Sequence, residues 1–560
     1  MPFSSFIRKF VLFLLLTICG YTAKAQLSDL HYLPPLKQES NNQAIRQQAV
    51  YLSTPVTAPF TVNVFRGTSL VPLTSFLLSK ASPVTYNLAD GDNNITLVTD
   101  ANTGIVLNNG GLRFESVTND RFYVNYRGRS NSQGASLTSK GRAAMGTNFR
   151  WGGSAIRANH YTMGASLGIM ATANGTNVTI SGYDPNCEFR LQNDPDGITS
   201  NTVSITLQAG ESYVLEAIKD QTNANIDGWL GATITSNNNI VISNGVLNFG
   251  VRSTSGSRDA GMDQPVPVDK LGAEYVFVRG EGGNSNEFPV IIGTVDNTDI
   301  FVNGSGTPIA NIDNGEYFEI PGTNYSGTSV GDNMYVTTSQ DVYAYQVLSG
   351  ASGIHTVGLN FVAPVNCLLP DTVDNIPDIR EVAGITITGG VTIIAATATP
   401  DTNISVTDGT SSITLPPSNP VAGSTDWKTF YVPGLTGDVV VQSTGPIAVG
   451  FVGFNGARGV GGYFSGFDTA PNLNLQITGQ GCFPNGSIEI VGTEVFDAYQ
   501  WYKNNSPISG ATSDSLTPDG PGDYYVEVTK GPCTYDSNVI QLGTCTIITN
   551  RRITFRVRPN

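Results

Sequence analysis

A polar turn followed by a short strand of alternating apolar and polar residues occurs three times along the chain. The copies are ANGTNVTISG at residues 173–182, VDNTDIFVNG at 295–304 and PDTNISVTDG at 400–409. Side chains of a strand alternate between its two faces, so this pattern predicts half-buried β-strands that begin at Gly- and Asn-rich turns. The pattern returns at intervals of 122 and 105 residues, which indicates a repeat architecture.

A second pattern, two short strands separated by a polar turn, closes each copy. It is found at residues 234–243, 336–344 and 441–449, and in a weaker form at 117–124. We therefore expect about four repeated antiparallel β units in an all-β region spanning residues 50–472. Four strands per unit fit propeller-like blades and tandem sandwiches equally well, so the pattern alone does not choose between them.

A different module is expected at residues 476–546. The segment AYQWYKNNSPISG places Trp501 where an immunoglobulin-like strand carries its core tryptophan, and PDGPGDYYVEV places Tyr524 at the corner that opens a later strand. Antibody domains have a cysteine two residues after that tyrosine, and this chain has Val526. We predict an immunoglobulin-like β-sandwich with Trp501 and Tyr524 in its core, and a generic sandwich of similar size is the alternative.

The two ends of the chain have their own signals. Residues 1–25 combine two basic residues, an 11-residue apolar run and an Ala-Lys-Ala site, which predicts a secretory signal peptide cleaved after Ala25. Residues 26–49 are polar and read as a lead-in to the repeats. Residues 547–560 form a basic, period-two C-terminal strand, which is either an edge strand protected by arginines or a segment recognised by export machinery.

Composition narrows the classes of partner. The chain has 45 acidic and 30 basic residues, which gives a net charge of −15. Three of the basic residues lie in the predicted signal peptide, so its removal makes the chain more acidic. Nucleic acids and anionic lipids bind clustered Lys and Arg, so both are disfavoured as partners. No apolar run after the signal peptide is long enough to span a membrane, so no transmembrane segment is expected. We expect a secreted or cell-surface protein.

Five cysteines follow the signal peptide, an odd number for a chain exported to an oxidising compartment. We predict disulfides between Cys482 and Cys533 and between Cys187 and Cys367. Spacing alone does not fix such pairings.

Candidate chemistry is sparse. The three histidines, His31, His160 and His355, are isolated from one another and from cysteine clusters, and the chain has no nucleophile elbow, P-loop or dinucleotide fingerprint. Asp90, Asp92 and Asn94 alternate oxygen donors as a calcium loop does, but DG and DN are also ordinary turn dipeptides. We therefore predict no enzymatic activity, no cofactor and no metal site other than this calcium candidate.

Aromatic residues are the remaining route to a binding surface, because exposed Tyr and Trp commonly contact ligands and partner proteins. The candidates are Trp151, Tyr161, Tyr343 and Tyr345. Tyr343 and Tyr345 share one face of an alternating strand, so they are equally well explained as core residues.

Several short sequence motifs together carry a resemblance to a known family. AVYLSTP, DNTDIFVNG, GESYVLEA and MDQPVPVDKLGAEY resemble the IgG Fc-binding protein N-terminal domain family, with Asp263 through Tyr275 as the most specific part. The resemblance covers roughly residues 50–470. Members of that family occur in mucus-associated animal proteins and in secreted bacterial proteins. The resemblance implies a binding role, but it transfers no ligand, because no binding residue of the family can be matched to a position here.

We expect an exported, non-enzymatic binding or adhesion protein that recognises an extracellular protein or glycan through the repeat region. The alternative is a structural component of a bacterial cell-surface layer or gliding-motility apparatus. A secreted glycan-processing enzyme ranks third.

Overall fold

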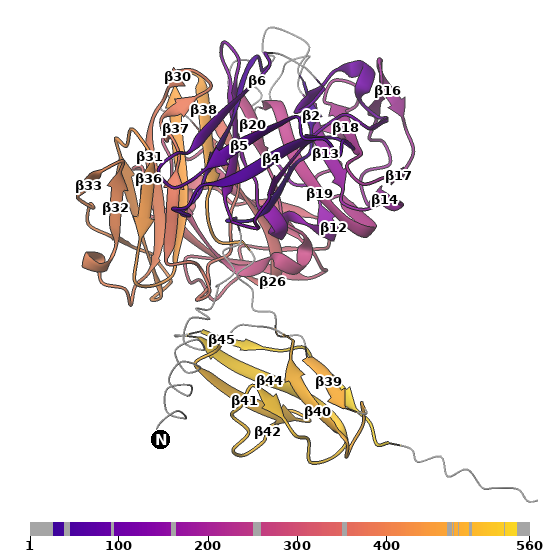
Figure 1. The fold of residues 1–560 in the computed structure, drawn as a ribbon, viewed down its shortest axis with the longest axis vertical. Helices are drawn as coiled ribbons and strands as arrows, with labels where there is room; N and C mark the ends of the chain where they lie inside the picture. Colours follow the sequence, from indigo (N-terminus) through magenta and orange to yellow (C-terminus); the bar gives the residue numbers. More distant parts are fainter. Residues whose placement is uncertain are drawn as a thin grey trace, which may run out of the picture. The chain divides into compact units, whose positions relative to one another are not determined.

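The structure is a computed structural model (Figure 1). It describes residues 26–38, 45–90, 94–157, 164–249, 259–349, 356–467, 473, 475–479, 481–491, 495–530 and 533–545. These residues form β-strands and a few short 3-10 turns, which confirms the all-β prediction. In this part of the chain, no helix has the length and hydropathy to cross a membrane. One compact unit, Ala23–Ala470, holds the repeat region, and residues from Pro471 onward fall in another.

The second repeat unit shows the topology. Strand β13 (Gly164–Ala171) pairs with β18 (Ser212–Ile218) and with the later half of the long strand β19 (Thr233–Phe249). Strand β14 (Thr176–Ser181) pairs with β17 (Val203–Leu207) and with the earlier half of β19. The long strand therefore serves two sub-sheets, and β17 ends one of them as an edge strand.

The same pairing occurs in the third unit, whose strands are β22 (Phe288–Gly293), β23 (Thr298–Val302), β24 (Ala310–Ile312), β25 (Tyr317–Glu319) and the long β26 (Asn333–Ser349). The sequence pattern predicted two strands separated by a turn at the closing position. In the second and third units the chain instead continues as one 17-residue strand, whose earlier half pairs with β14 or β23 and whose later half pairs with β13 or β22.

In the first and fourth units the closing strand is interrupted, as the pattern predicted. The first unit consists of β3 (Gln47–Ser53), β4 (Phe60–Arg66), β5 (Thr74–Leu78), β6 (Val84–Leu88), β9 (Leu112–Ser116) and β10 (Tyr123–Arg129). The fourth consists of β31 (Thr388–Ala396), β32 (Ser405–Asp408), β33 (Ser411–Ile413), β35 (Trp427–Pro433), β36 (Val439–Gln442) and β37 (Ile447–Asn455). Both pair in the order seen in the second unit.

One further strand follows each unit, and these four strands lie against one another. They are β11 (Gly134–Thr138), β20 (Asp259–Asp263), β27 (Thr356–Phe361) and β38 (Arg458–Tyr463). Contacts run from β11 to β20, from β20 to β27, from β27 to β38 and from β38 back to β11. The four units therefore close into a ring, and Figure 1 shows the second unit on the right and the fourth on the left.

Residues 26–49 correct a prediction, because part of this polar lead-in is packed core. Strand β1 (Leu30–Leu33) pairs with β9, and Leu33 and Leu36 are buried in the first unit. His31 is buried as well, with Nε2 2.8 Å from the carbonyl oxygen of Phe122, and burial lowers its pKa to about 4. This segment is buried because it packs against hydrophobic residues that are distant in sequence.

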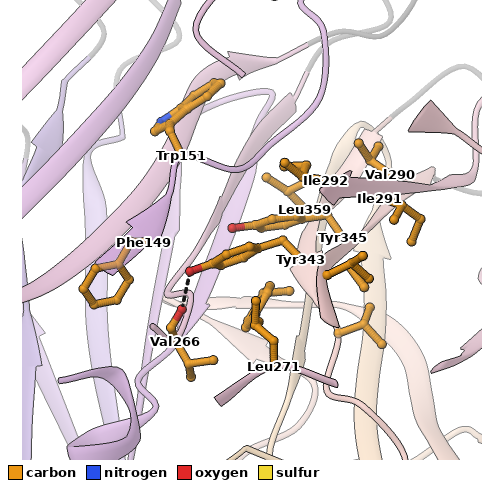
Figure 2. Close-up of a cluster of buried hydrophobic side chains, with 14 of the residues drawn as sticks. Phe149, Trp151, Val266, Leu271, Val290, Ile291, Ile292, Tyr343, Tyr345 and Leu359 are labelled. Carbon is orange, nitrogen blue, oxygen red and sulfur yellow. Dashed lines mark hydrogen bonds between the residues drawn. The ribbon is translucent and has the colours of Figure 1, made fainter. Parts of the chain in front are cut away.

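A shared core lies between the second and third units (Figure 2). Trp151 stacks on Trp229 with ring centroids 4.1 Å apart, and Tyr343 donates a hydrogen bond of 2.8 Å to the carbonyl oxygen of Val266. Tyr343 and Tyr345 are fully buried, and Trp151 is 2 % exposed. These three aromatic residues are therefore core residues, and the contact interpretation of Trp151 is wrong. Tyr161 lies outside the described residues.

The C-terminal unit is a β-sandwich. One sheet contains β39 (Leu475–Gly479), β40 (Gly486–Ile490) and β43 (Ser515–Leu516). The other contains β41 (Ala498–Lys503), β42 (Ser506–Pro507), β44 (Gly522–Lys530), β45 (Cys533–Asp536) and β46 (Ile540–Leu542). Trp501 is paired with Val526 in register, both are buried, and Tyr524 donates a hydrogen bond of 2.7 Å to the carbonyl oxygen of Gly520.

The cysteines do not pair as predicted. Cys482 forms a disulfide with Cys545, because the last described segment runs beside Phe483, while Cys533 lies on β45 in the opposite sheet. Cys187 is a buried free thiol, so its predicted bond to Cys367 is wrong. Burial raises the pKa of the Cys187 thiol to about 12, which makes it unreactive. Residues 1–25 and 547–560, including the proposed basic strand, lie outside the described residues.

Candidate functional site

Two buried aspartates on β20 hold the centre of the ring. The Asp259 carboxylate accepts hydrogen bonds from the backbone amides of Gly134 at 2.6 Å and Gly459 at 2.7 Å. Gly134 belongs to β11 after the first unit, and Gly459 belongs to β38 after the fourth. One side chain from the second unit therefore joins the first and last units of the ring.

Asp263, at the other end of β20, reaches the third unit. Its carboxylate accepts a hydrogen bond of 2.9 Å from the backbone amide of Phe361 and lies 3.1 Å from the Nζ atom of Lys140. The neighbouring Gln264 accepts a hydrogen bond of 2.7 Å from the backbone amide of Lys140. The Asp263 and Lys140 side chains are 2 % and 0 % exposed, so this ion pair is sealed from water.

Burial dominates the electrostatics of this axial cluster, defined as Lys140, Asp259, Asp263 and Gln264. Loss of hydration raises the pKa values of Asp259 and Asp263 and lowers the pKa of Lys140. The hydrogen bonds and the ion pair oppose these shifts, because they favour the charged forms. Each polar group of the cluster is directed at another part of the ring, so its role is to position the four units.

Glu287 is a third buried carboxyl group, in the loop before β22. It accepts hydrogen bonds from the backbone amides of Gly280 and Gly282, the latter at 2.9 Å. Burial raises its pKa from 4.5 to about 7. Between these two pH values the folded protein holds a proton that the unfolded chain has lost, so stability falls as the pH rises from 4.5 to about 7.

Replacing Glu287 by glutamine, which mimics the protonated carboxyl group, is expected to remove this dependence. Relative to wild type, the free energy of unfolding of the variant should rise by up to about 3 kcal/mol between low pH and pH 8. Urea unfolding of both proteins across that range measures the difference. Exposed Glu316→Gln is the control, and parallel pH profiles for wild type and Glu287→Gln would contradict the prediction.

The calcium candidate has an ordinary structural explanation for one of its members. Asn94 has a φ of 56°, and its side-chain oxygen accepts hydrogen bonds from the Thr99 amide at 3.3 Å and from the Asn102 side chain at 3.0 Å. Asp90 is exposed, and Asp92 lies outside the described residues. In the described ranges, no three His, Cys, Asp or Glu residues gather as metal ligands would. His160 and His355 also lie outside these ranges.

One aromatic pair that the sequence analysis did not select lies on the surface of the C-terminal unit. Tyr502 on β41 and Tyr525 on β44 are cross-strand partners whose rings stack with centroids 4.7 Å apart and an interplanar angle of 2°. Both are half-buried on the outer face of the sheet. The alternation that points Trp501 and Tyr524 inward points this pair outward, and that alternation was the signal that could have found it.

Comparison with known families identifies the repeat region. The family described as IgGFc binding protein matches residues 134–453, from the start of β11 into β37. The chain belongs to this family. The matched residues are more than half of the chain and include the second and third units and most of the fourth.

The most specific string of the IgGFc-binding resemblance now has a physical explanation. It begins at Asp263 and Gln264, which belong to the axial cluster, and it ends at Tyr275, whose hydroxyl donates a 2.7 Å hydrogen bond to the carbonyl oxygen of Val342. These contacts join β20, β21 (Gly272–Val278) and the long strand of the third unit. In this family member both ends of the string therefore maintain the ring, and within it only Asp269 is exposed.

Other comparisons add little to the family assignment. No curated protein sequence matches the chain. A crystal structure of the N-terminal eight immunoglobulin domains of Down Syndrome Cell Adhesion Molecule, isoform 1.30.30, matches with 8 % identity, a TM-score of 0.10, and coverage of 93 % of this chain and 85 % of that one. A score so low supports no conclusion about this fold.

Proposed function

We propose that this chain is an exported, non-enzymatic binding protein that recognises an extracellular protein or glycan through its repeat region. The observation that carries the proposal is the family match over residues 134–453, because a binding family covers the second and third units of the ring and most of the fourth. The disulfide between Cys482 and Cys545 is consistent with an oxidising compartment outside the cytosol. The signal peptide and cleavage after Ala25 remain predictions.

The ring suits a receptor for a physical reason. The Asp259 and Asp263 contacts fix the four units relative to one another, so surface loops on different units keep constant spacing without a ligand. A surface organised before binding loses less conformational entropy when a partner docks. The C-terminal unit then serves as a spacer or a second contact.

The test is a binding screen of the chain without residues 1–25 against immunoglobulins and their Fc fragment, mucins, matrix proteins and glycans. We expect saturable binding by this chain and none by residues 476–560 alone, which belong to a separate compact unit. A Tyr502→Ala, Tyr525→Ala variant of the longer chain should bind as wild type does. Silence across the panel, or binding by residues 476–560 alone that is as strong as that of the longer chain, would overturn a receptor role for the repeat region.

A further inference from the structure

The four repeat units offer four equivalent edge strands, and this equivalence provides an internal comparison. Strands β5, β17, β24 and β33 each end a sheet, and each pairs with the second strand of its unit. Strands β5, β24 and β33 follow that strand across a turn, whereas β15 (Phe189–Leu191) and β16 (Asp194–Ile198) lie between β14 and β17. An edge strand presents unpaired backbone groups, and native proteins commonly keep such edges polar. Residues at matching positions therefore show which edge departs from that rule.

Three of the four edges follow the rule. The residue before the last one of each strand is exposed and pairs with the neighbouring strand, and these residues are Leu77, Thr206, Asn311 and Ser412. Thr206 and Asn311 make cross-strand hydrogen bonds of 2.8 Å to Asn177 and Asp299. The Leu77 side chain cannot form a hydrogen bond of this kind, and Leu77 is 64 % exposed.

The turn before β5 departs in the same way. The Ser69 hydroxyl donates to the carbonyl oxygen of Val71 at 2.8 Å and accepts from the Val71 amide at 3.2 Å. In the third unit, Ser305 makes the same two contacts with Thr307, at 2.8 and 3.1 Å. Gly306 and Thr307 thus stand where the first unit has Leu70 and Val71, so this turn does not require apolar residues.

The second unit supports that conclusion. Ser200 donates the matching hydrogen bond to the carbonyl oxygen of Thr202 at 2.8 Å, with Asn201 between them. At one further position the third unit is apolar too, because Ile309 occupies the place of Leu73 and is 40 % exposed. The distinction of the first unit therefore rests on Leu70, Val71 and Leu77.

The exposed apolar side chains of the first unit form a strip, defined as Leu70, Val71, Leu73 and Leu77. They are 86, 74, 48 and 64 % exposed, which amounts to roughly 500 Å² and falls in the range of the largest, often functional patch on a monomer. The loop is held in place, because Arg66 donates a hydrogen bond of 2.6 Å to the carbonyl oxygen of Asn109 and the Thr68 amide donates one of 2.9 Å to that of Asn108.

Charge indicates what covers the strip. Residues 67–79 contain no Asp, Glu, Lys or Arg, whereas the whole chain carries a net charge of −15. Two copies of an acidic protein repel each other, so they can approach most easily where both surfaces are neutral. A strand edge is also complementary to itself, because two antiparallel copies satisfy each other's backbone groups.

We propose that the apolar strip and β5 form the contact between two copies of this chain, related by a two-fold axis. The Val117 amide bonds to the carbonyl oxygen of Thr61, so the odd-numbered residues of β4 face β9 and its even-numbered residues face β5. Because Thr74, Phe76 and Leu78 pair with those even-numbered residues, Ser75 and Leu77 direct their backbone groups away from β4. Antiparallel pairing about Phe76 places Leu77 of one copy beside Ser75 of the other. The contact buries about 1,000 Å² in total, at the lower end for specific interfaces, so the dimer is reversible.

Sedimentation velocity across a wide range of protein concentration tests this proposal, using the chain without residues 1–25. Wild type should shift from monomer toward twice that mass, at high salt as well, because the strip is uncharged. The triple variant Leu70→Asn, Val71→Thr, Leu77→Thr takes its residues from the second unit and should raise the dissociation constant by at least about tenfold. The matched variant Thr307→Ser, Asn311→Thr in the third unit should dimerise as wild type does.

A wild-type chain that stays monomeric, or a triple variant that dimerises as wild type does, would overturn the proposal. Equal unfolding midpoints for the two variants and wild type show that any difference arises from the surface, since such surface changes cost little stability. The dimer does not depend on the proposed receptor function. A monomer that binds a ligand in the screen, or a dimer that binds none, separates the two proposals.

Discussion

Replacing Asp263 by alanine is expected to lower the free energy of unfolding of the repeat region by about 3–5 kcal/mol. The substitution leaves the buried Lys140 ammonium without a counter-charge and the Phe361 amide without an acceptor. Each loss is costly because neither group can reach water. Urea unfolding followed by tryptophan fluorescence measures the change, since Trp151 and Trp229 lie in the core of the second and third units.

A partly exposed pair of the same types provides the control. Lys219 and Asp220 lie 3.3 Å apart, with the Asp220 side chain 40 % exposed, so Asp220→Ala should cost no more than about 1 kcal/mol. Combining Asp263→Leu with Lys140→Met should cost less than the sum of the two single changes, because the unpaired charge disappears. An Asp263→Ala variant as stable as Asp220→Ala would show that the axial ion pair does not hold the ring.

Local signals explain what could be predicted from the sequence. The repeat copies end at Gly182, Gly304 and Gly409, whose φ values are +75°, +73° and +58°. Glycine reaches this left-handed region without steric strain. One or two residues next to each strand are therefore enough to predict its turn. Alternation next to such turns was sufficient to find the units, and the inward positions of Trp501 and Tyr524 followed from the same alternation.

Long-range contacts explain what could not be predicted. Residues 26–49 look polar, yet β1 is buried because β9, some eighty positions later, supplies its ladder. The residues that flank Lys140 and Asp263 in sequence give no sign of an ion pair, and the two side chains come together only when the ring closes. The Cys482–Cys545 bond likewise depends on which segments of the sandwich become neighbours. Sequence spacing does not predict these long-range contacts.

The first and fourth units are neighbours in the ring although they are not consecutive in sequence. Arg127 is buried at the seam, defined as the contact between these two units. From β10 its guanidinium donates hydrogen bonds to three backbone carbonyls of the fourth unit, at 2.7 Å to Asp378, 2.8 Å to Glu381 and 2.9 Å to Pro377. It also lies 4.2 Å from the centre of the Tyr51 ring. One side chain thus satisfies several acceptors and packs on an aromatic face.

Replacing Arg127 by methionine is expected to cost about 3–5 kcal/mol, because buried carbonyl oxygens that lose their donor each cost about 1–3 kcal/mol. Arg127→Lys should recover only part of this loss, since an ammonium cannot present the planar fork of donors. The matched control is Arg129→Met, two residues along the same strand, where Nε makes a single hydrogen bond of 2.9 Å to the carbonyl oxygen of Ala383.

Hydrogen exchange locates the effect as well as measuring it. If the seam is the weakest contact of the ring, Arg127→Met should speed exchange first in β3 and in β28 (Thr372–Ile376), which meet there through the 2.6 Å hydrogen bond from Ser53 to the carbonyl oxygen of Asn375. The long strands β19 and β26 should keep their protection, because their ladders lie within single units. Equal exchange in the Arg127→Met and Arg129→Met variants would mean that closure of the ring rests on the axial aspartates alone.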